Sequence, residues 1–235
     1  MIWGVVTFPG SNCDRDCVHV LRDVLAQDVR EVWHEHRSLA GLDAVVLPGG
    51  FSYGDYLRAG AIAATAPVMV GVREAAHRGA VILGICNGFQ ILTEAGLLPG
   101  TLLPNRHFRF ICRDVWVRVE TTRTPFTQGL RVGDLLRMPI AHAEGRYMVP
   151  AEVRAQLENQ AQVVFRYVDA RGRAVPSANP NGAVRAIAGV CNAQGNVVGL
   201  MPHPERCAES LMGSTDGRRL FESVAASVLT AMAGR

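Results

Sequence analysis

The chain has 235 residues, 49% of them hydrophobic, and a formal net charge of +3, which is enough to bury a sizeable core in one domain over residues 1–235. No run of about 18 apolar residues predicts a membrane span, and the N-terminus lacks the basic flank and cleavage site of a secretory signal, so we expect a cytoplasmic protein. All 24 basic residues are arginines spread along the chain, which argues against a nucleic-acid partner and excludes the lysine of a phosphate-binding loop.

The first half of the chain alternates short apolar runs with segments of helical pattern. A strand over residues 2–8 ends at the turn Pro-Gly-Ser-Asn, after which Asn12 or a neighbour can cap a helix of roughly residues 14–27. The elements that follow are strands at 30–34, 43–48 and 80–85 and a helical stretch at 57–78. This alternation predicts a flavodoxin-like, doubly wound, mainly parallel sheet with helices on both faces, whose ligands bind at the carboxyl ends of the strands.

The second half is less regular. Residues 108–120 alternate like a strand with one open face, and residues 163–169 and 197–202 have the composition of further strands. We expect helix to return only over residues 216–232, where one apolar face carries Leu220, Val224, Val228 and Leu229. No internal repeat or long linker divides the sequence, which favours a single domain.

Cys86 stands between Gly84 and Gly88, where the strand at 80–85 gives way to a helical pattern. A strand, a tight turn and a helix that begins near Asn87 would raise the thiol above the sheet edge, as in a nucleophile elbow, and glycines leave room for the sharply folded backbone. The helix N-terminus favours the thiolate form. A buried, inert cysteine is the alternative, because free cysteine is among the most buried residue types.

A cysteine nucleophile needs a base, and His203 is the candidate. It follows the strand expected at 197–202, has a proline on each side, and precedes Glu205 by two positions. In a doubly wound sheet the end of that strand faces the same edge as Cys86, so His203 would accept the thiol proton while Glu205 holds the imidazole in one tautomer. The alternative is a solvated loop histidine.

The glycine pair after the strand at 43–48 is the candidate oxyanion site. Gly49 and Gly50 also lie at the carboxyl end of a strand, where their backbone N–H groups would point into the site. The amide of Asn87, directly after the nucleophile, is the natural second donor. Two glycines also occur in ordinary strand-to-helix loops, which is the alternative interpretation.

Three segments, "GICNGFQ", "LPGGFSYGD" and "MPHPER", resemble the class I (triad) glutamine amidotransferases. Within that family, "FPGSNCDRD", "AHAEGRY" and "NPNG" are most similar to the glutaminase subunits of phosphoribosylformylglycinamidine synthases, from purine biosynthesis. The similarity runs from about residue 2 to the segment at 214–223. It implies that glutamine is hydrolysed to glutamate and ammonia through a thioester.

The same resemblance implies a role for each residue of the site. Cys86 would be the nucleophile, His203 the proton shuttle and Glu205 its orienting partner, with the amides of Gly50 and Asn87 as the oxyanion hole. The implied glutamine-binding residues are Gly49, Phe51, Gln90, His142 and Glu144. Relatives usually have glycine where this chain has Ala143, so the backbone of that loop is where a departure is expected.

The resemblance also implies partners. Family members of this length work with a large ATP-using synthetase subunit and a small third subunit, so no cofactor is expected on this chain, and ATP and Mg are expected on the synthetase. The absence of a phosphate-loop lysine fits that division of labour.

The remaining cysteines are not expected to carry chemistry. With no secretory signal we expect the six cysteines to remain thiols, and Cys13 and Cys17 to be structural, with no metal site, because no second ligand pair accompanies them. One alternative function is a cysteine hydrolase or stress protein of the flavodoxin-like superfamily, against which "PHPE" argues. The other is a non-catalytic regulatory subunit, against which the intact Cys86, His203 and Glu205 argue.

Overall fold

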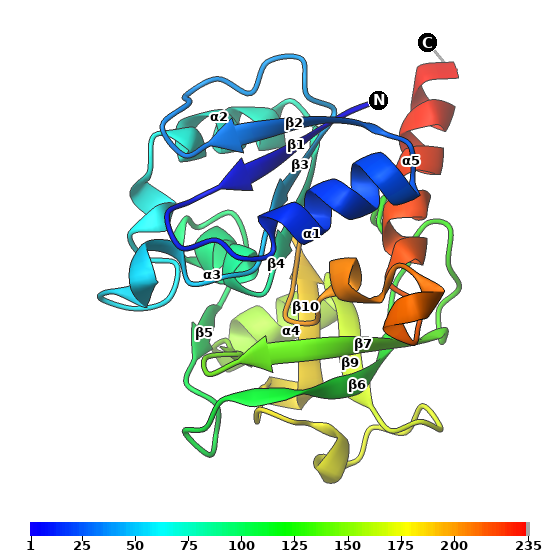
Figure 1. Ribbon diagram of the computed structural model, residues 1–235. Helices are drawn as coiled ribbons and strands as arrows, with labels where there is room; N and C mark the ends of the chain where they lie inside the picture. Colours follow the sequence, from blue (N-terminus) through cyan, green and yellow to red (C-terminus); the bar gives the residue numbers. More distant parts are fainter. Residues whose placement is uncertain (234–235) are drawn as a thin grey trace.

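The computed structural model describes residues 1–233, with side chains to residue 228, and contains one nine-stranded sheet (Figure 1). The strands of this sheet are β1 (Ile2–Thr7), β2 (Asp28–Trp33), β3 (Ala44–Leu47), β4 (Val81–Ile85), β6 (Ile111–Val119), β7 (Leu135–His142), β9 (Val163–Val168), β10 (Ile187–Cys191) and β11 (Val197–Leu200), in the order β2-β1-β3-β4-β11-β10-β9-β6-β7. The short strands β5 (Thr101–Leu103) and β8 (Arg146–Met148) pair separately.

Helices and helical turns connect several of these strands. The α-helices are α1 (Asp14–His19), α2 (Val68–His77), α3 (Asn87–Glu94), α4 (Ala151–Asn159) and α5 (Arg218–Ala233). A π-helical turn, η1 (Val20–Val24), continues α1, and the 3-10 turns are η2 (Ser52–Asp55), η3 (Ala63–Thr65), η4 (Pro176–Ala178), η5 (Val184–Ala186), η6 (Pro204–Cys207) and η7 (Ser210–Met212). Within the described residues, no helix combines the length and apolarity needed to cross a bilayer.

The N-terminal strands form the parallel part of the sheet. Strands β2, β1, β3, β4 and β11 are all paired in parallel, and β3 and β4 are buried at every position because helices cover both of their faces. This confirms the predicted mainly parallel, doubly wound sheet. Strands β10, β9, β6 and β7 then extend it by antiparallel pairing. The expected strand at 108–120 is part of that extension.

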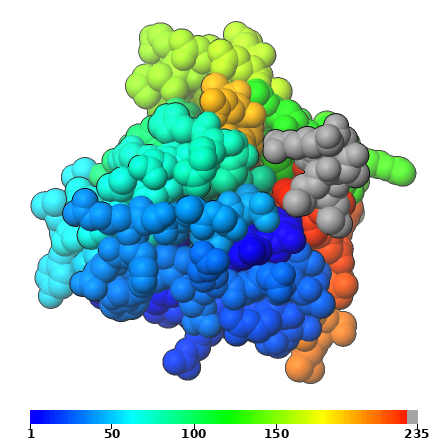
Figure 2. All heavy atoms as spheres, turned by 90° about the horizontal axis from the view of Figure 1, so that it is seen from above, coloured from blue at the N-terminus to red at the C-terminus, as the bar shows by residue number. Residues whose placement is uncertain are grey.

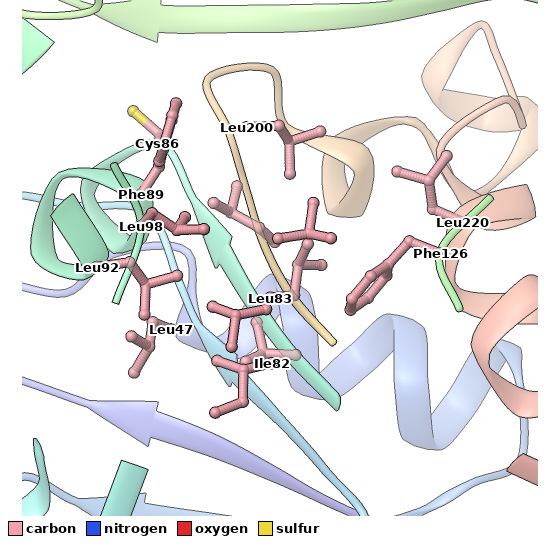
Figure 3. Close-up of a cluster of buried hydrophobic side chains, with 14 of the residues drawn as sticks. Leu47, Ile82, Leu83, Cys86, Phe89, Leu92, Leu98, Phe126, Leu200 and Leu220 are labelled. Carbon is pink, nitrogen blue, oxygen red and sulfur yellow. The ribbon is translucent and has the colours of Figure 1, made fainter. Parts of the chain in front are cut away.

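The core lies on both faces of β4. On one face, Phe89 of α3 and the nearby Leu98 pack against the bare backbone of Gly199 in β11. On the other face, α5 buries Leu220, and its Phe221 ring lies 6.1 Å from the ring of Trp3 in β1. Figure 3 shows Phe89 and Leu98 on one side of β4 and Leu220 on the other, with the sulfur of Cys86 at the end of the strand. Apolar side chains therefore cover both faces of the sheet beside β4.

Helix α4 contradicts the prediction that helix returns only near the C-terminus. It projects at one end of the molecule (Figure 2), and Leu157 is its one fully buried residue. A helix with so narrow an apolar stripe has almost no periodic signal in its sequence. Strand β10 was also missed. Strand β7 was missed because it contains Pro139, which is tolerated since β7 is an edge strand.

The helix predicted at roughly 14–27 begins at Asp14 as α1 and continues through η1 to Val24, but its predicted cap and one other helix boundary were wrong. Asn12 does not cap α1, whose N-cap is Cys13 without a side-chain cap; the Asn12 side chain instead accepts a hydrogen bond from the Cys13 thiol. The helix expected at 57–78 begins at Val68, because Leu57 has φ 73° and Gly60 has φ 81°. In α5, Leu220 and Val224 are buried and Val228 packs on the core, whereas the Leu229 side chain lies outside the described residues.

Candidate active site

Cys86 occupies the sharp turn between β4 and α3 that the sequence predicts. Its backbone has φ 50° and ψ −102°, a conformation that side-chain-bearing residues rarely adopt and that surrounding structure must hold in place. Two backbone hydrogen bonds stabilise this conformation. The Cys86 N–H donates to the Leu200 carbonyl of β11 at 2.8 Å, and the Cys86 carbonyl accepts from Phe89 N–H of α3 at 3.0 Å. The thiol is thereby fixed at the carboxyl end of the parallel strands.

The flanking glycines are required by close approach of the backbone. A Cβ on Gly84 would lie 2.6 Å from the Gly88 carbonyl oxygen, and a Cβ on Gly88 would collide with the Leu47 carbonyl of β3. Neither contact involves a side chain that could rotate away. The Gly-x-Cys-x-Gly pattern is thus explained by packing of α3 onto β3 and β4.

His203 and Glu205 form a buried pair just after β11. His203 Nδ1 lies 2.7 Å from Glu205 Oε1, and the side chains are 2% and 0% exposed. The His203 backbone N–H donates to the Pro139 carbonyl of β7, which anchors this turn to the sheet edge. Burial alone would lower the pKa of His203, but the charge of Glu205 and the proximity of Cys86 outweigh it, so the pKa lies well above its usual range.

Cys86 and His203 are brought together by strand pairing. β4 and β11 are adjacent and parallel, with Ile85 opposite Leu200. The segments that follow the two strands therefore leave the sheet side by side at its carboxyl end. Within the described residues, His203 Nε2 is buried without a hydrogen-bond partner, while Nδ1 faces Glu205. In the neutral ring, whose Nδ1 proton faces Glu205, the lone pair is therefore on Nε2, and the raised pKa favours the form in which Nε2 has taken up a proton.

The glycine loop after β3 lies against this pair. A Cβ on Gly49 would lie 2.7 Å from His203 Cε1, and Gly50 has φ +149° with its Cα packed on the segment at 10–12. That segment, from the "FPGSN" motif, is tied to the loop because Phe51 N–H donates to the Gly10 carbonyl at 2.9 Å and Asn12 N–H donates to the Gly49 carbonyl at 3.4 Å. Phe51, which follows, is 44% exposed. The loop is thus held by backbone contacts on both sides.

Asn87 begins α3, so its backbone N–H has no acceptor within its own helix. Its side chain is fully engaged: Oδ1 accepts from Ser52 N–H at 3.1 Å, and Nδ2 donates to Gln90 Oε1 at 2.9 Å and to Asp55 Oδ1 at 3.3 Å. Gln90 Nε2 in turn donates to the Glu144 carbonyl at 2.6 Å. This chain of hydrogen bonds links the loops of Asp55 and Glu144 across the start of α3.

His142 is buried at the end of β7 and is neutral. Burial, reinforced by nearby His203, lowers its pKa to about 4. Its Nδ1 faces Asn105 Oδ1 at 3.0 Å, an oxygen that also accepts from Gly145 N–H, so the proton of the ring is on Nδ1. Nε2 is left as a buried acceptor without a partner among the described residues.

The segment from His142 to Gly145 is held by two asparagines that the sequence reasoning did not assign. Asn105 contacts it through His142 and Gly145, and Asn181, in the "NPNG" motif, donates to the Gly145 carbonyl at 2.7 Å. Both are fully buried. A buried asparagine has no signature in sequence, and only the motif around Asn181 was a signal. Ala143 has a negative φ, so alanine adds no backbone strain here.

Asp55 was also not singled out. It is half-buried, and burial followed by the negative charge of Glu144 raises its pKa to about 6, against the opposing hydrogen bond from Asn87. Cys17 is buried in the core, as expected of a structural thiol, but Cys13 is not remote from the site: its Sγ lies 3.8 Å from His203 Nδ1.

Comparisons with known proteins show the family of this chain. A family model described as "CobB/CobQ-like glutamine amidotransferase domain" matches residues 3–225. The chain is 58% identical to phosphoribosylformylglycinamidine synthase subunit PurQ of Thermomicrobium roseum, over 95% of each chain. It is 54% identical to the protein of the same name from Salinibacter ruber, over 94% of each chain.

A solved structure described as PurLQS from Thermotoga maritima contains a chain with 44% identity and a TM-score of 0.85, with 97% of this chain and 98% of that chain covered. Sequence and fold therefore lead to one family, and the resemblance stated from the motifs is confirmed. The chain belongs to the class I glutamine amidotransferases, in the family of phosphoribosylformylglycinamidine synthase PurQ subunits.

Proposed function

We propose that this chain hydrolyses glutamine and supplies the ammonia to a synthetase partner in the formation of phosphoribosylformylglycinamidine. The observation that carries the proposal is the convergence of the Cys86 turn with the buried His203–Glu205 pair at the ends of two neighbouring strands. A thiol, an imidazole and a carboxylate in this order form a nucleophile, a proton shuttle and an orienting group.

The chemistry follows from the positions of these groups. His203 Nε2 takes the thiol proton as Cys86 Sγ bonds to the side-chain carbonyl carbon of glutamine, and then delivers that proton to the departing nitrogen, which leaves as ammonia. Water attacks the resulting thioester with His203 again as base, and glutamate leaves as the C–S bond breaks. Glu205 stabilises the imidazolium that forms in each half of the reaction.

The oxyanion and substrate contacts are part of the proposal. The amides of Gly50 and Asn87 would bind the developing oxyanion, since Gly49 packs on His203 and Asn87 directly follows the nucleophile. Gln90 and Glu144 meet beside Asn87 and would bind glutamine together with Gly49, Phe51 and His142. The unprotonated Nε2 of His142 suits an N–H donor and would repel a carboxylate, which fits an amide substrate.

The partners are proposed from the family. The solved relative is a PurLQS assembly, and we propose that this chain, acting as one glutaminase domain over residues 1–235, works with a large synthetase subunit that binds ATP and Mg and with a small third subunit. The nucleotide chemistry then takes place on the partner, and this chain needs no cofactor of its own.

The test is ammonia substitution in the complex. Cys86→Ala should abolish glutamine-dependent product formation, with no glutamate released, but leave synthesis from added ammonium intact, because only the ammonia source is lost. Cys112→Ser, at an exposed cysteine, is the matched control and should behave as wild type. Equal use of glutamine by the Cys86 variant and wild type would reject the nucleophile. Loss of both activities would point to a purely structural role in the complex.

A further inference from the structure

Three different ligand atoms meet on the Nδ1 side of the His203 ring. They belong to Cys13, Glu205 and His203 itself. The thiol sulfur, an imidazole nitrogen and a carboxylate oxygen lie within 4.8 Å of one another, and all three side chains are buried. Cys13 Sγ and Glu205 Oε1 both face the same nitrogen, His203 Nδ1, at 3.8 and 2.7 Å. Glu205 Oε2 is also buried and has no hydrogen-bond partner among the described residues, so this carboxylate has spare acceptor capacity.

This donor set is the one that Zn²⁺ prefers. Sulfur, nitrogen and oxygen ligands at about 2.3, 2.0 and 2.0 Å in tetrahedral directions are separated by about 3.6 Å for sulfur and nitrogen and about 3.3 Å for nitrogen and oxygen. The sulfur-to-nitrogen distance of 3.8 Å is already close to that value, and the distance of 2.7 Å from Nδ1 to Oε1 needs to widen by roughly half an ångström. Three protein ligands leave the fourth position for water.

We propose that Cys13, His203 and Glu205 form an inhibitory site for Zn²⁺ that switches off the base of the glutaminase. The inference rests on the proposed role of His203. The cation takes the position of the Nδ1 proton: that proton and the thiol proton leave to solvent, and lone pairs of sulfur, nitrogen and oxygen bind the metal.

The switch follows from the two nitrogens of the ring. When Nδ1 carries the proton toward Glu205, Nε2 has a lone pair for the thiol proton of Cys86. When Nδ1 binds a metal, a neutral ring must carry its proton on Nε2, and no acceptor remains for Cys86. The metal also occupies the carboxylate that stabilises the imidazolium. Binding at Cys13 thus stops turnover without touching the nucleophile.

Charges around the site set its affinity. A thiolate and a carboxylate neutralise Zn²⁺, whereas the Arg206 guanidinium, which donates to Cys13 Sγ at 3.0 Å, opposes the cation. Arg206 is itself paired with Asp16 at 3.4 Å, which reduces this repulsion. The Cys13 thiol must lose its proton to bind the cation, so zinc binding should tighten as pH rises.

Metal binding is measured without reference to activity. In a Cys86→Ala background, which removes the nucleophile as a ligand, Co²⁺ should bind once per chain and show a thiolate-to-cobalt charge-transfer band, and Zn²⁺ should displace it. Adding Cys13→Ser should abolish the band and weaken binding at least about 100-fold, since loss of even an outer partner costs about 10- to 100-fold. Cys112→Ser is the matched control and should keep the band. A circular dichroism spectrum checks folding.

Two results of the cobalt titration would overturn the proposed site. A band that survives Cys13→Ser, or no cobalt binding by the Cys86→Ala chain, overturns the site. If Cys13→Ser does not fold, Glu205→Gln in the same background should leave the sulfur band but weaken cobalt binding by a similar factor, and unchanged affinity overturns the site.

The effect on glutaminase is the second measurement. Zinc should inhibit glutamate release by the wild type, reversibly by chelator, while Cys13→Ser, relative to its own metal-free rate, should require at least about 100-fold more zinc. Equal sensitivity of the two overturns the inhibitory role. An absence of glutaminase activity without metal would instead reject the proposed function, and the cobalt titration would still decide the site.

Discussion

Gly88 in the first turn of α3 lies directly against the backbone carbonyl of Leu47 at the end of β3, with no space for a side chain between them. Because Gly88 follows Cys86 by two positions, this contact sets how far the start of α3 approaches the sheet. The relation between a helix and a neighbouring strand thus determines where Cys86 is held.

Gly88→Ala tests that relation through the sign of a stability change. In an unconstrained helix, alanine is more favourable than glycine by about 1 kcal/mol. Here the collision with Leu47 should instead lower the free energy of unfolding, by about 1–3 kcal/mol for overpacking, and should reduce glutamate release by displacing Cys86. Urea denaturation measures the first effect. A variant more stable than wild type would show that α3 can move away from β3 freely.

The His203–Glu205 pair predicts graded losses of activity. His203→Ala should lower kcat for glutamine by about 10²–10⁴-fold, because general acid–base catalysis is lost. Glu205→Gln should lower it less, since the imidazole remains but its charged form is no longer stabilised. Steady-state glutamate release gives both values. An unchanged rate in the His203 variant would assign the base to another residue.

The same pair predicts a dependence of stability on pH. Because Glu205 and Cys86 keep the pKa of buried His203 well above its usual range, the protonated ring stabilises the fold fully below the ordinary histidine pKa, and this contribution is lost as pH rises toward the raised pKa. Glu205→Gln should remove most of it. Urea denaturation across neutral and alkaline pH should therefore show a steeper decline for wild type than for the variant, and parallel curves would contradict this.

Asp55 predicts a pH effect of its own. Its folded pKa of about 6, against 3.8 ordinarily, means that ionisation is unfavourable in the folded protein. Wild type should therefore lose stability relative to Asp55→Asn as pH rises from about 4 to 6, and the difference should stay constant above that. Asp169→Asn is the control of opposite sign, because hydrogen bonds from Arg173 lower the pKa of that carboxyl. A pH-independent difference for Asp55 would contradict the assignment.

Asn105 predicts coupled losses of stability and substrate affinity. Asn105→Ala removes the acceptor of His142 Nδ1–H and Gly145 N–H and leaves buried groups unpaired, which should cost about 2–4 kcal/mol of unfolding free energy. The KM for glutamine should also rise, because the His142–Gly145 segment loses its support. Asn192→Ala, in the turn before β11 and so at the opposite end of that strand from His203, should leave the KM unchanged. A normal KM for both variants would separate this segment from glutamine binding.

The sequence by itself determined the local parts of the site. The strand, glycine, cysteine, glycine and helix of the elbow lie within a few residues, and His203 and Glu205 are two apart, so strand periodicity, turn chemistry and spacing were sufficient to propose them. The parallel half of the sheet was predictable for the same reason, since its strands are buried on both faces and read as continuous apolar runs.

Only the tertiary structure decided which distant groups meet. The contact of Cys13 with His203 Nδ1 depends on how the loop after β1 packs on the loop after β3, and the support of His142 by Asn105 depends on a segment that precedes β6. Neither contact is signalled by a hydrophobic periodicity or a motif spacing in the sequence. A buried polar contact is set by strand order and register, which long-range packing determines. For this reason local patterns could place Cys86 but not the groups that surround His203.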